Sequence, residues 1–157
     1  MHILVTYDSK TGNTEKMALA IAEGVRKRGV DVVVKKANET TNADLLKADG
    51  IIVGSPTYYG QMSAKVKSMF DKSVKIHGKL EGKVGAAFTS SGGVASGAET
   101  TILSILQAML VHGMIVQGHA NAEHYGVAVV GEPKEREEEK CKKRGEMIAD
   151  LLLKLNP

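Results

Sequence analysis

The chain alternates short apolar runs with longer amphipathic segments, and this alternation restricts the possible folds more than any other feature. Runs such as Ile51-Ile52-Val53 are continuously apolar, which is typical of strands buried on both faces of a parallel sheet. Other segments place apolar side chains at helical spacing. We expect strands at residues 2–7, 31–36, 50–55, 83–90, 114–117 and 125–130, and helices at residues 14–28, 42–47, 63–73, 99–112 and 135–155.

Five strand–helix units of this kind predict an α/β fold in which helices cover both faces of a parallel sheet, giving three layers. The strand runs are too few for an eight-stranded barrel. A doubly wound five-stranded sheet in the order 2-1-3-4-5 accommodates them, and such sheets bind ligands beyond the carboxyl ends of their strands. Because no internal repeat or linker interrupts the sequence, we expect residues 1–157 to form a single domain.

The composition is that of an ordinary globular protein and excludes several functional classes. Hydrophobic residues make up 43% of the chain and charged residues 25%, and the formal net charge is only +3. The lysines are dispersed and aromatic side chains are few, so we expect no nucleic-acid partner. No apolar run approaches the length of a membrane span, so we expect no membrane insertion.

The chain contains one cysteine, Cys141, which cannot form an internal disulfide or a thiolate metal cluster. It falls on the apolar side of the last predicted helix, where we expect a buried thiol. The histidines lack the spacing of metal ligands, and we predict neither a metal site nor a catalytic residue. His112 precedes Gly113 at a helix end, where we expect a cationic cap. The single thiol and the absence of a secretory signal predict a cytoplasmic location.

The loop between the first strand and the first helix is rich in hydroxyl groups. It lacks the glycine spacing of a Walker loop and of a dinucleotide fingerprint. Backbone N–H groups and the helix dipole favour a bound anion at a helix N-terminus. We therefore expect a phosphorylated ligand, with a ligand-free Ser/Thr helix cap as the alternative. The residues concerned are Ser9, Lys10, Thr11, Gly12, Asn13 and Thr14.

Two further loops follow the third and fourth predicted strands. One carries paired tyrosines and then a glycine, and the other is rich in serine and glycine, which lets its backbone approach a flat ligand closely. All three loops meet at one edge of the sheet, where a phosphorylated aromatic heterocycle would fit. The alternative for the tyrosines is a surface turn with one ring packed on the core. The residues are Pro56, Thr57, Tyr58, Tyr59 and Gly60, then Ser90, Ser91, Gly92, Gly93 and Val94.

These motifs resemble those of a known family. The sequence Ser-x-Thr-Gly-Asn-Thr after the first strand is similar to the flavodoxin phosphate signature. The later motifs resemble more specifically the flavodoxin-like NAD(P)H:quinone oxidoreductases of the WrbA type. They are Gly54-Ser-Pro-Thr-Tyr-Tyr-Gly-Gln-Met-Ser63, Glu99-Thr-Thr-Ile102 and His112-Gly-Met114. The resemblance implies a flavodoxin-like, FMN-binding domain over residues 1–157.

The resemblance also implies a role for each loop. Residues 9–14 would hold the FMN phosphate. Residues 56–60 would flank the isoalloxazine, with Thr57 and Tyr58 near its polar edge. Residues 90–94 would cover the pyrimidine side of the ring. The glycine that follows the paired tyrosines would offer its carbonyl to the protonated flavin N(5), because glycine tolerates positive φ.

Two functions remain open from the sequence. An electron carrier that docks to redox partner proteins is favoured by the lack of tryptophan and by short segments after the second strand and around the fifth, where the WrbA-type enzymes are longer. An enzyme that passes electrons from NAD(P)H to a quinone is favoured by the motif at residues 54–63 and by the neutral-to-basic edge formed by Gln61, Lys65 and Lys67. Either would be a monomer or a small homo-oligomer.

A third reading, a non-redox phosphate-binding regulatory domain of the same topology, is the least favoured. Such receiver domains need a cluster of acidic residues at the strand ends. Asp8 alone does not supply one.

Overall fold

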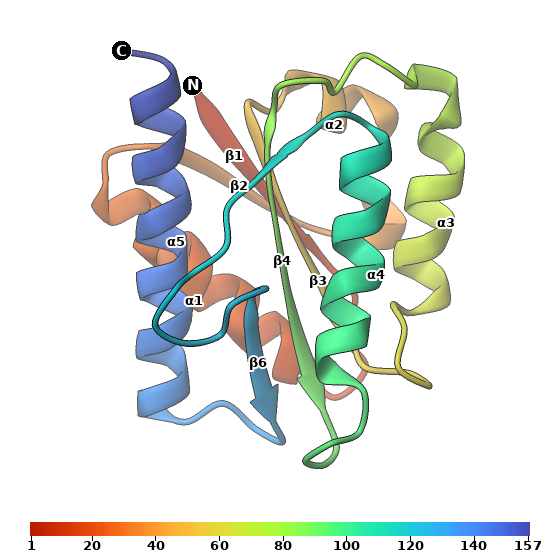
Figure 1. The fold of residues 1–157 in the computed structure, drawn as a ribbon, viewed down its shortest axis with the longest axis vertical. Coiled ribbons are helices and arrows are strands. Elements are labelled where there is room, and N and C mark those ends of the chain that lie inside the picture. The colour runs from red at the N-terminus through yellow and green to blue at the C-terminus, as the bar shows by residue number, and fades with distance from the viewer.

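The computed structural model describes residues 1–157, and helices and strands alternate along the chain as predicted (Figure 1). Every predicted boundary agrees with the structure to within two residues. The strands are β1 (His2–Tyr7), β2 (Asp31–Lys36), β3 (Gly50–Pro56), β4 (Val84–Ser91), β5 (Ile115–Val116) and β6 (Val127–Val130). The helices are α1 (Asn13–Lys27), α2 (Asn42–Lys47), α3 (Ala64–Lys72), α4 (Ala98–Val111) and α5 (Glu135–Leu155), with short 3-10 turns η1 (Ala37–Glu39) and η2 (Ser73–Ile76).

The strands form one sheet with only parallel pairs, and the predicted order 2-1-3-4-5 is confirmed. Helices α1 and α5 cover one face, while α3 and α4 cover the other, which gives three layers (Figure 1). Neighbouring residues of β1 belong to opposite cores, as the period of a strand requires. Ile3 packs with Phe88 and Ile148 under α1 and α5, whereas Leu4 packs with Ile105 on the other face.

The loops that follow the strands gather at one end of the molecule. In Figure 1 the carboxyl ends of β4 and β6 point downward, and both chain termini lie at the opposite, upper end. The loop from β1 to α1, the loop from β3 to α3 and the loop from β4 to α4 therefore share the lower edge. This arrangement brings together the three loops that were predicted to hold a ligand.

The fifth strand position is divided between β5 and β6. β5 pairs with Val84 and Gly85, and β6 pairs with the last four residues of β4, so the middle of this edge has no strand beside it. Residues 117–126 leave the sheet there and pass over α5 before β6 begins (Figure 1). At Gly126 the chain returns to β4. It passes so close to this strand that a Cβ atom at Gly126 would lie 2.1 Å from the carbonyl oxygen of Ala87. Only glycine fits this return point without a shift of the backbone.

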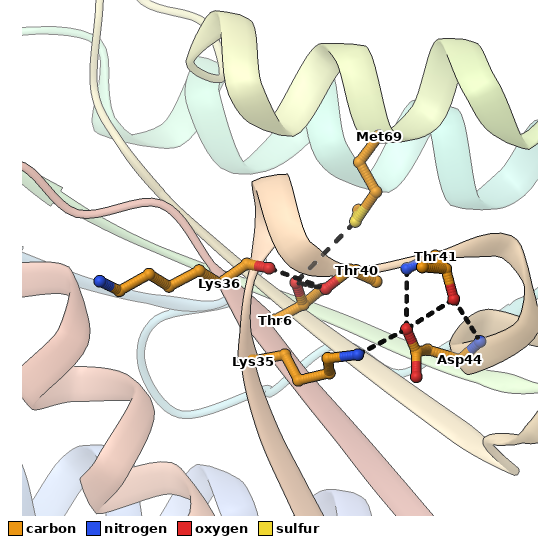
Figure 2. A network of polar contacts seen from close by, with 7 residues as sticks. All are labelled: Thr6, Lys35, Lys36, Thr40, Thr41, Asp44 and Met69. Atoms are coloured by element: carbon orange, nitrogen blue, oxygen red, sulfur yellow. Dashed lines mark hydrogen bonds and ion pairs between the residues drawn. The ribbon is translucent and has the colours of Figure 1, made fainter.

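A polar network fixes the short connection between β2 and α2 (Figure 2). The Asp44 carboxylate accepts hydrogen bonds from the Thr41 backbone N–H and from the Lys35 ammonium, each at 2.8 Å. These donors, the Lys35 hydrogen bond first, lower the pKa of Asp44 to about 2. Thr40 joins the connection to β1, because its hydroxyl lies 2.7 Å from the Thr6 hydroxyl. The segment after the second strand is therefore short and firmly held.

Helices α1 and α5 touch through glycines, which fixes their position relative to each other. A Cβ atom at Gly24 would lie 1.9 Å from the carbonyl oxygen of Lys142, and one at Gly145 would lie 2.1 Å from that of Ile21. Backbones this close leave no room for side chains at either position. The second half of α1 is thereby held close against α5.

The prediction that His112 forms a cationic cap at the end of α4 is wrong. The ring is buried, and its Nε2 atom lies 2.7 Å from the Ser73 hydroxyl oxygen. Burial, with a smaller contribution from His77, lowers the pKa of His112, so the neutral imidazole is favoured. The helix ends instead through backbone hydrogen bonds of His112 and Gly113.

The prediction for Cys141 is confirmed. Its side chain is fully buried, and burial raises the pKa of the thiol to about 12. No helix combines the length and the hydropathy needed to cross a bilayer.

Candidate functional site

A cavity of about 220 Å³ lies at the carboxyl edge of the sheet and unites the three predicted loops. Ten of the sixteen predicted residues line it: Lys10, Thr11, Asn13, Thr14, Pro56, Thr57, Tyr58, Ser90, Ser91 and Gly92. The other six lie in the same loops outside the wall of the cavity: Ser9, Gly12, Tyr59, Gly60, Gly93 and Val94. Gly131, which follows β6, also lines the cavity and was missed. No motif surrounds it in the sequence, and only the pairing of β6 with β4 brings it here.

The N-terminus of α1 presents unused hydrogen-bond donors to this cavity. Gly12 is the N-cap residue with φ of 96°, a conformation that favours glycine. Its own N–H donates to the Ser9 hydroxyl at 3.1 Å. The backbone N–H groups of Thr11, Asn13 and Thr14 donate to no acceptor in the protein. Free donors at the positive end of a helix dipole are the features that hold an anion without a counter-charge.

Hydroxyl groups tie the three loops to one another. The hydroxyls of Thr14 and Ser90 lie 2.8 Å apart and join the first loop to the third in a buried contact. The Thr57 backbone N–H donates to the Ser90 carbonyl oxygen at 2.8 Å, and this joins the second loop to the third. On the far side, the Gly131 N–H donates to the Ser91 carbonyl oxygen, also at 2.8 Å. These hydrogen bonds fix the walls of the cavity relative to the ends of β4 and β6.

The paired tyrosines occupy a tight turn, and their rings lie in different surroundings. The backbone groups of Tyr58 and Gln61 exchange two hydrogen bonds, while Tyr59 and Gly60 between them have φ values of 50° and 72°. Tyr58 lines the cavity and is 44% exposed, whereas Tyr59 is completely exposed. Of the two rings, Tyr58 is the one placed to contact a ligand. The carbonyl oxygen of Gly60 accepts no hydrogen bond within the protein.

The third loop combines internal support with free donors. The hydroxyls of Ser91 and Ser96 both donate to the Gly93 carbonyl oxygen, at 3.1 and 2.7 Å. The N–H groups of Gly92 and Gly93 have no acceptor in the protein. Val94 lies at the tip and is exposed. The loop can therefore donate hydrogen bonds to a polar ring edge while its shape is maintained from within.

The charges near the site are few and mostly paired. Asp8, at the end of β1, forms an ion pair of 3.6 Å with Lys65, and Lys67 pairs with Asp71 on its own helix. Lys10 is exposed in the first loop and has no carboxylate within 4 Å. Apart from Lys10, the donors that face the cavity are neutral.

Comparisons with known proteins agree with this geometry. A family model described as NADPH-dependent FMN reductase matches residues 33–126, which is more than half of the chain. A flavodoxin from Aquifex aeolicus is 42% identical over 94% of this chain and 85% of its own length. The chain belongs to the flavodoxin-like FMN proteins. Its resemblance to that family, its fold and FMN as its cofactor are thereby confirmed.

The chain is similar both to flavodoxins and to proteins named as quinone dehydrogenases within this flavodoxin-like family. An NAD(P)H dehydrogenase (quinone) from Archaeoglobus fulgidus is 36% identical over 98% of both sequences. The crystal structure of a WrbA-like flavodoxin from Agrobacterium tumefaciens superposes with a TM-score of 0.85 over 98% of both chains, at 25% identity. The chain is thus similar to proteins named as flavodoxins and to proteins named as quinone dehydrogenases.

Proposed function

We propose that the cavity at the carboxyl edge is the FMN site, with the phosphate at the N-terminus of α1. The unused N–H groups of Thr11, Asn13 and Thr14 support this placement, because a phosphate needs several donors. The hydroxyls of Ser9 and Thr11 and the ammonium of Lys10 add further donors from the same loop. The buried hydroxyl of Thr14 has a second role, since it also contacts Ser90.

The isoalloxazine belongs between the second and third loops. Tyr58 supplies an aromatic wall, with Pro56 and Thr57 beside it. The free N–H groups of Gly92 and Gly93 face the pyrimidine edge from the other side, next to Ser91. In this arrangement the sheet orients both walls, so little ordering is needed when FMN binds.

We propose further that the protein is an electron carrier that exchanges electrons with redox partner proteins. FMN supplies the one- and two-electron chemistry, while the protein binds and orients the ring. The main support is the exposure of Tyr59 and Val94, which belong to the second and third loops next to the cavity and leave this edge of the molecule open. A carrier must leave the edge of its cofactor accessible to a partner surface.

The second candidate is an NAD(P)H:quinone oxidoreductase. It is supported by the 36% identity with the Archaeoglobus fulgidus enzyme over nearly the whole chain. The neutral-to-basic surroundings of the site, with Lys65 paired to Asp8, also fit an enzyme that accepts a negatively charged nicotinamide cofactor. A reducing compartment such as the cytoplasm suits both candidates, because the only thiol is buried and unreactive.

Anaerobic reduction of the FMN-loaded protein distinguishes the two candidates. We expect dithionite to bleach the flavin absorbance fully, and NADH or NADPH to bleach it only slowly. Rapid bleaching by either nucleotide, followed by rapid reoxidation with a benzoquinone, would replace the carrier by the oxidoreductase. Failure of the protein to retain FMN through gel filtration would contradict the assigned site itself.

A further inference from the structure

A second cavity, of about 310 Å³, lies between α5 and the segment 117–126 that leaves the sheet edge. Its lining residues are His119, Ala122, Glu123, Val127, Lys140, Lys143, Arg144 and Met147. It shares no residue with the proposed FMN site. The two cavities lie at opposite ends of β6, since Val127 lines one and Gly131 lines the other. Val127 and Gly131 are four positions apart along the chain, which corresponds to about 13 Å in a strand.

Arg144 is the unusual member of this lining. It lies on the buried stripe of α5, between Cys141 and Ile148, where an apolar side chain is expected. Its side chain is only 6% exposed. A buried cation costs free energy unless it is paired, and burial lowers the pKa of this guanidinium, although arginine stays charged in proteins. A residue of this kind on a core stripe indicates a role other than packing.

The guanidinium has too few partners for its charge. Nη2 donates to the Glu123 carbonyl oxygen at 3.2 Å, and Nη1 lies 3.9 Å from the Met147 sulfur. No carboxylate oxygen lies within 4 Å of Arg144. The Glu123 carboxylate is instead paired with Lys140 at 2.8 Å. A planar group with five donors thus uses only one of them on an oxygen atom.

The surroundings of Arg144 suit an anion with an apolar body. Lys143, which also lines the cavity, likewise has no carboxylate within 4 Å, so neither of these adjacent cations forms an ion pair. The Glu123 carboxylate acts on Arg144 only from a greater distance and is itself paired with Lys140. Ala122, Val127 and Met147 provide apolar contact surface. The volume of about 310 Å³ lies at the lower end of the range that small-molecule sites occupy.

The segment over the cavity has a defined shape. The His119 N–H donates to the His124 carbonyl oxygen at 3.1 Å, and the Gly126 N–H donates to the Glu123 carbonyl oxygen at the same distance. The Glu123 backbone has φ of 51°, which is strained for a residue with a side chain. The Glu123 carbonyl oxygen accepts from both Gly126 and Arg144, so the guanidinium is anchored on one side and free on the other.

We propose that this cavity binds a small organic acid, whose carboxylate pairs with Arg144 and whose apolar body contacts Val127 and Met147. The fork of guanidinium donors matches the two oxygens of a carboxylate, and the bound anion supplies the missing counter-charge. Lys143 attracts the anion to the mouth of the cavity. The site is separate from the FMN site, and its occupation does not require the flavin.

The test is a titration of the FMN-loaded, ¹⁵N-labelled protein with benzoate, followed by two-dimensional NMR. Saturable shifts are expected at Glu123, Gly126 and the Arg144 side-chain Nε–H, with no shifts in residues 9–14. Benzamide has the same ring without the charge, and inorganic phosphate has charge without the ring. Both should bind more weakly than benzoate. Absence of saturable shifts with benzoate, or equal shifts with benzamide, would overturn the proposal, and tighter binding of phosphate would overturn the organic-acid assignment.

Two variants of α5 separate a binding role from a structural one. Arg144→Met keeps an unbranched side chain in the core and removes the charge, so benzoate should bind roughly tenfold to a hundredfold more weakly. Arg136→Met removes an exposed cation from the same helix and should leave benzoate affinity unchanged. Unchanged affinity in Arg144→Met would refute the pairing. Should that variant not fold, Arg144→Lys, which retains the charge but loses the fork, is expected to bind benzoate with intermediate affinity, and parental affinity in it would count against the pairing.

Discussion

The two proposed sites at the ends of β6 differ in the hydrogen-bond donors that they would offer to a negatively charged ligand. The cavity at the carboxyl edge presents neutral donors, chiefly the backbone N–H groups of Thr11, Asn13 and Thr14. The cavity beside α5 presents a buried cation, Arg144. Neutral donors at a helix N-terminus are tolerated in the empty site because water can satisfy them. A buried guanidinium without an ion pair costs free energy, so we expect an anion bound beside Arg144 to stabilise the fold.

The two regions also differ in how the fold supports them. Hydrogen bonds along the ends of β3, β4 and β6 fix the walls of the first cavity. The second cavity is covered by residues 117–126, which leave the sheet and return at Gly126. Loop motifs that follow strands can therefore predict the first cavity from the sequence. The second cavity depends on where residues 117–126 pass over α5, and no sequence motif marks that position.

The largest expected effect is the loss of affinity when the ligand lacks a phosphate. FMN should bind about a thousandfold more tightly than riboflavin, because each hydrogen bond to a charged group contributes about 1.5–3 kcal/mol and several are lost together. Quenching of flavin fluorescence during titration of the apoprotein measures both affinities. Equal affinities for FMN and riboflavin would show that the first cavity does not bind the phosphate. The comparison of two anion sites would then no longer hold.

The next effect concerns the return point of the chain. Gly126→Ala places a Cβ atom 2.1 Å from the Ala87 carbonyl oxygen and should lower the free energy of unfolding by about 2–3 kcal/mol. Gly92→Ala is the matched control, because a Cβ atom there meets nothing within 4 Å, and it should change stability by about 0.5 kcal/mol or less. Urea unfolding of the two apoproteins gives the comparison. Similar losses in both would show that Gly126 is not a constrained position.

Removal of one donor from the first cavity should have a smaller effect. Thr11→Ala should weaken FMN by about 2 kcal/mol, roughly thirtyfold, and leave riboflavin unchanged, since a hydroxyl bonded to phosphate is lost. Arg144→Met should leave FMN affinity unaltered. Fluorescence titration of both variants with both flavins provides the measurement. A loss of FMN affinity in Arg144→Met would mean that the two cavities are coupled.

The paired tyrosines give a comparison within a single turn. Tyr58→Ala should weaken FMN by about 1 kcal/mol beyond its lost contact area, because this ring lines the cavity. Tyr59→Ala should leave affinity unchanged, because its ring is wholly exposed. Isothermal titration of the two variants with FMN tests the assignment. The reverse order of effects would place Tyr59 against the ligand.

The smallest effect lies at the β2–α2 connection, which contacts neither the FMN cavity nor the cavity beside α5. The hydrogen bond from Lys35 lowers the pKa of Asp44 to about 2, so its stabilising effect is complete above about pH 4 and is lost as the pH falls towards 2. Asp44→Asn should lower the free energy of unfolding by about 1 kcal/mol at neutral pH, since solvent screens the pair. Unfolding curves at several pH values should converge with those of the parent in acid. A constant difference across this range would contradict the ionic origin.

Local patterns in the sequence predicted the fold and most of the residues that line the proposed FMN site. The apolar runs and helical stripes gave every helix and strand to within two residues, because each element buries a face of fixed period. The loops at residues 9–14, 56–60 and 90–94 met as expected, because parallel strands end at a common edge. The sequence did not distinguish Tyr58 from Tyr59, since their orientation depends on a turn with two positive φ values.

What the sequence alone determined is therefore the α/β topology, the single buried thiol and the chemistry of the three loops, all of which follow from neighbouring residues. Only the tertiary structure decided that Gly131 joins the first cavity, that His112 is buried and that Arg144 lies beneath residues 117–126. These three positions depend on contacts between segments far apart in the chain. Burial and pairing of a side chain are properties of such contacts, and no pattern within one segment specifies them.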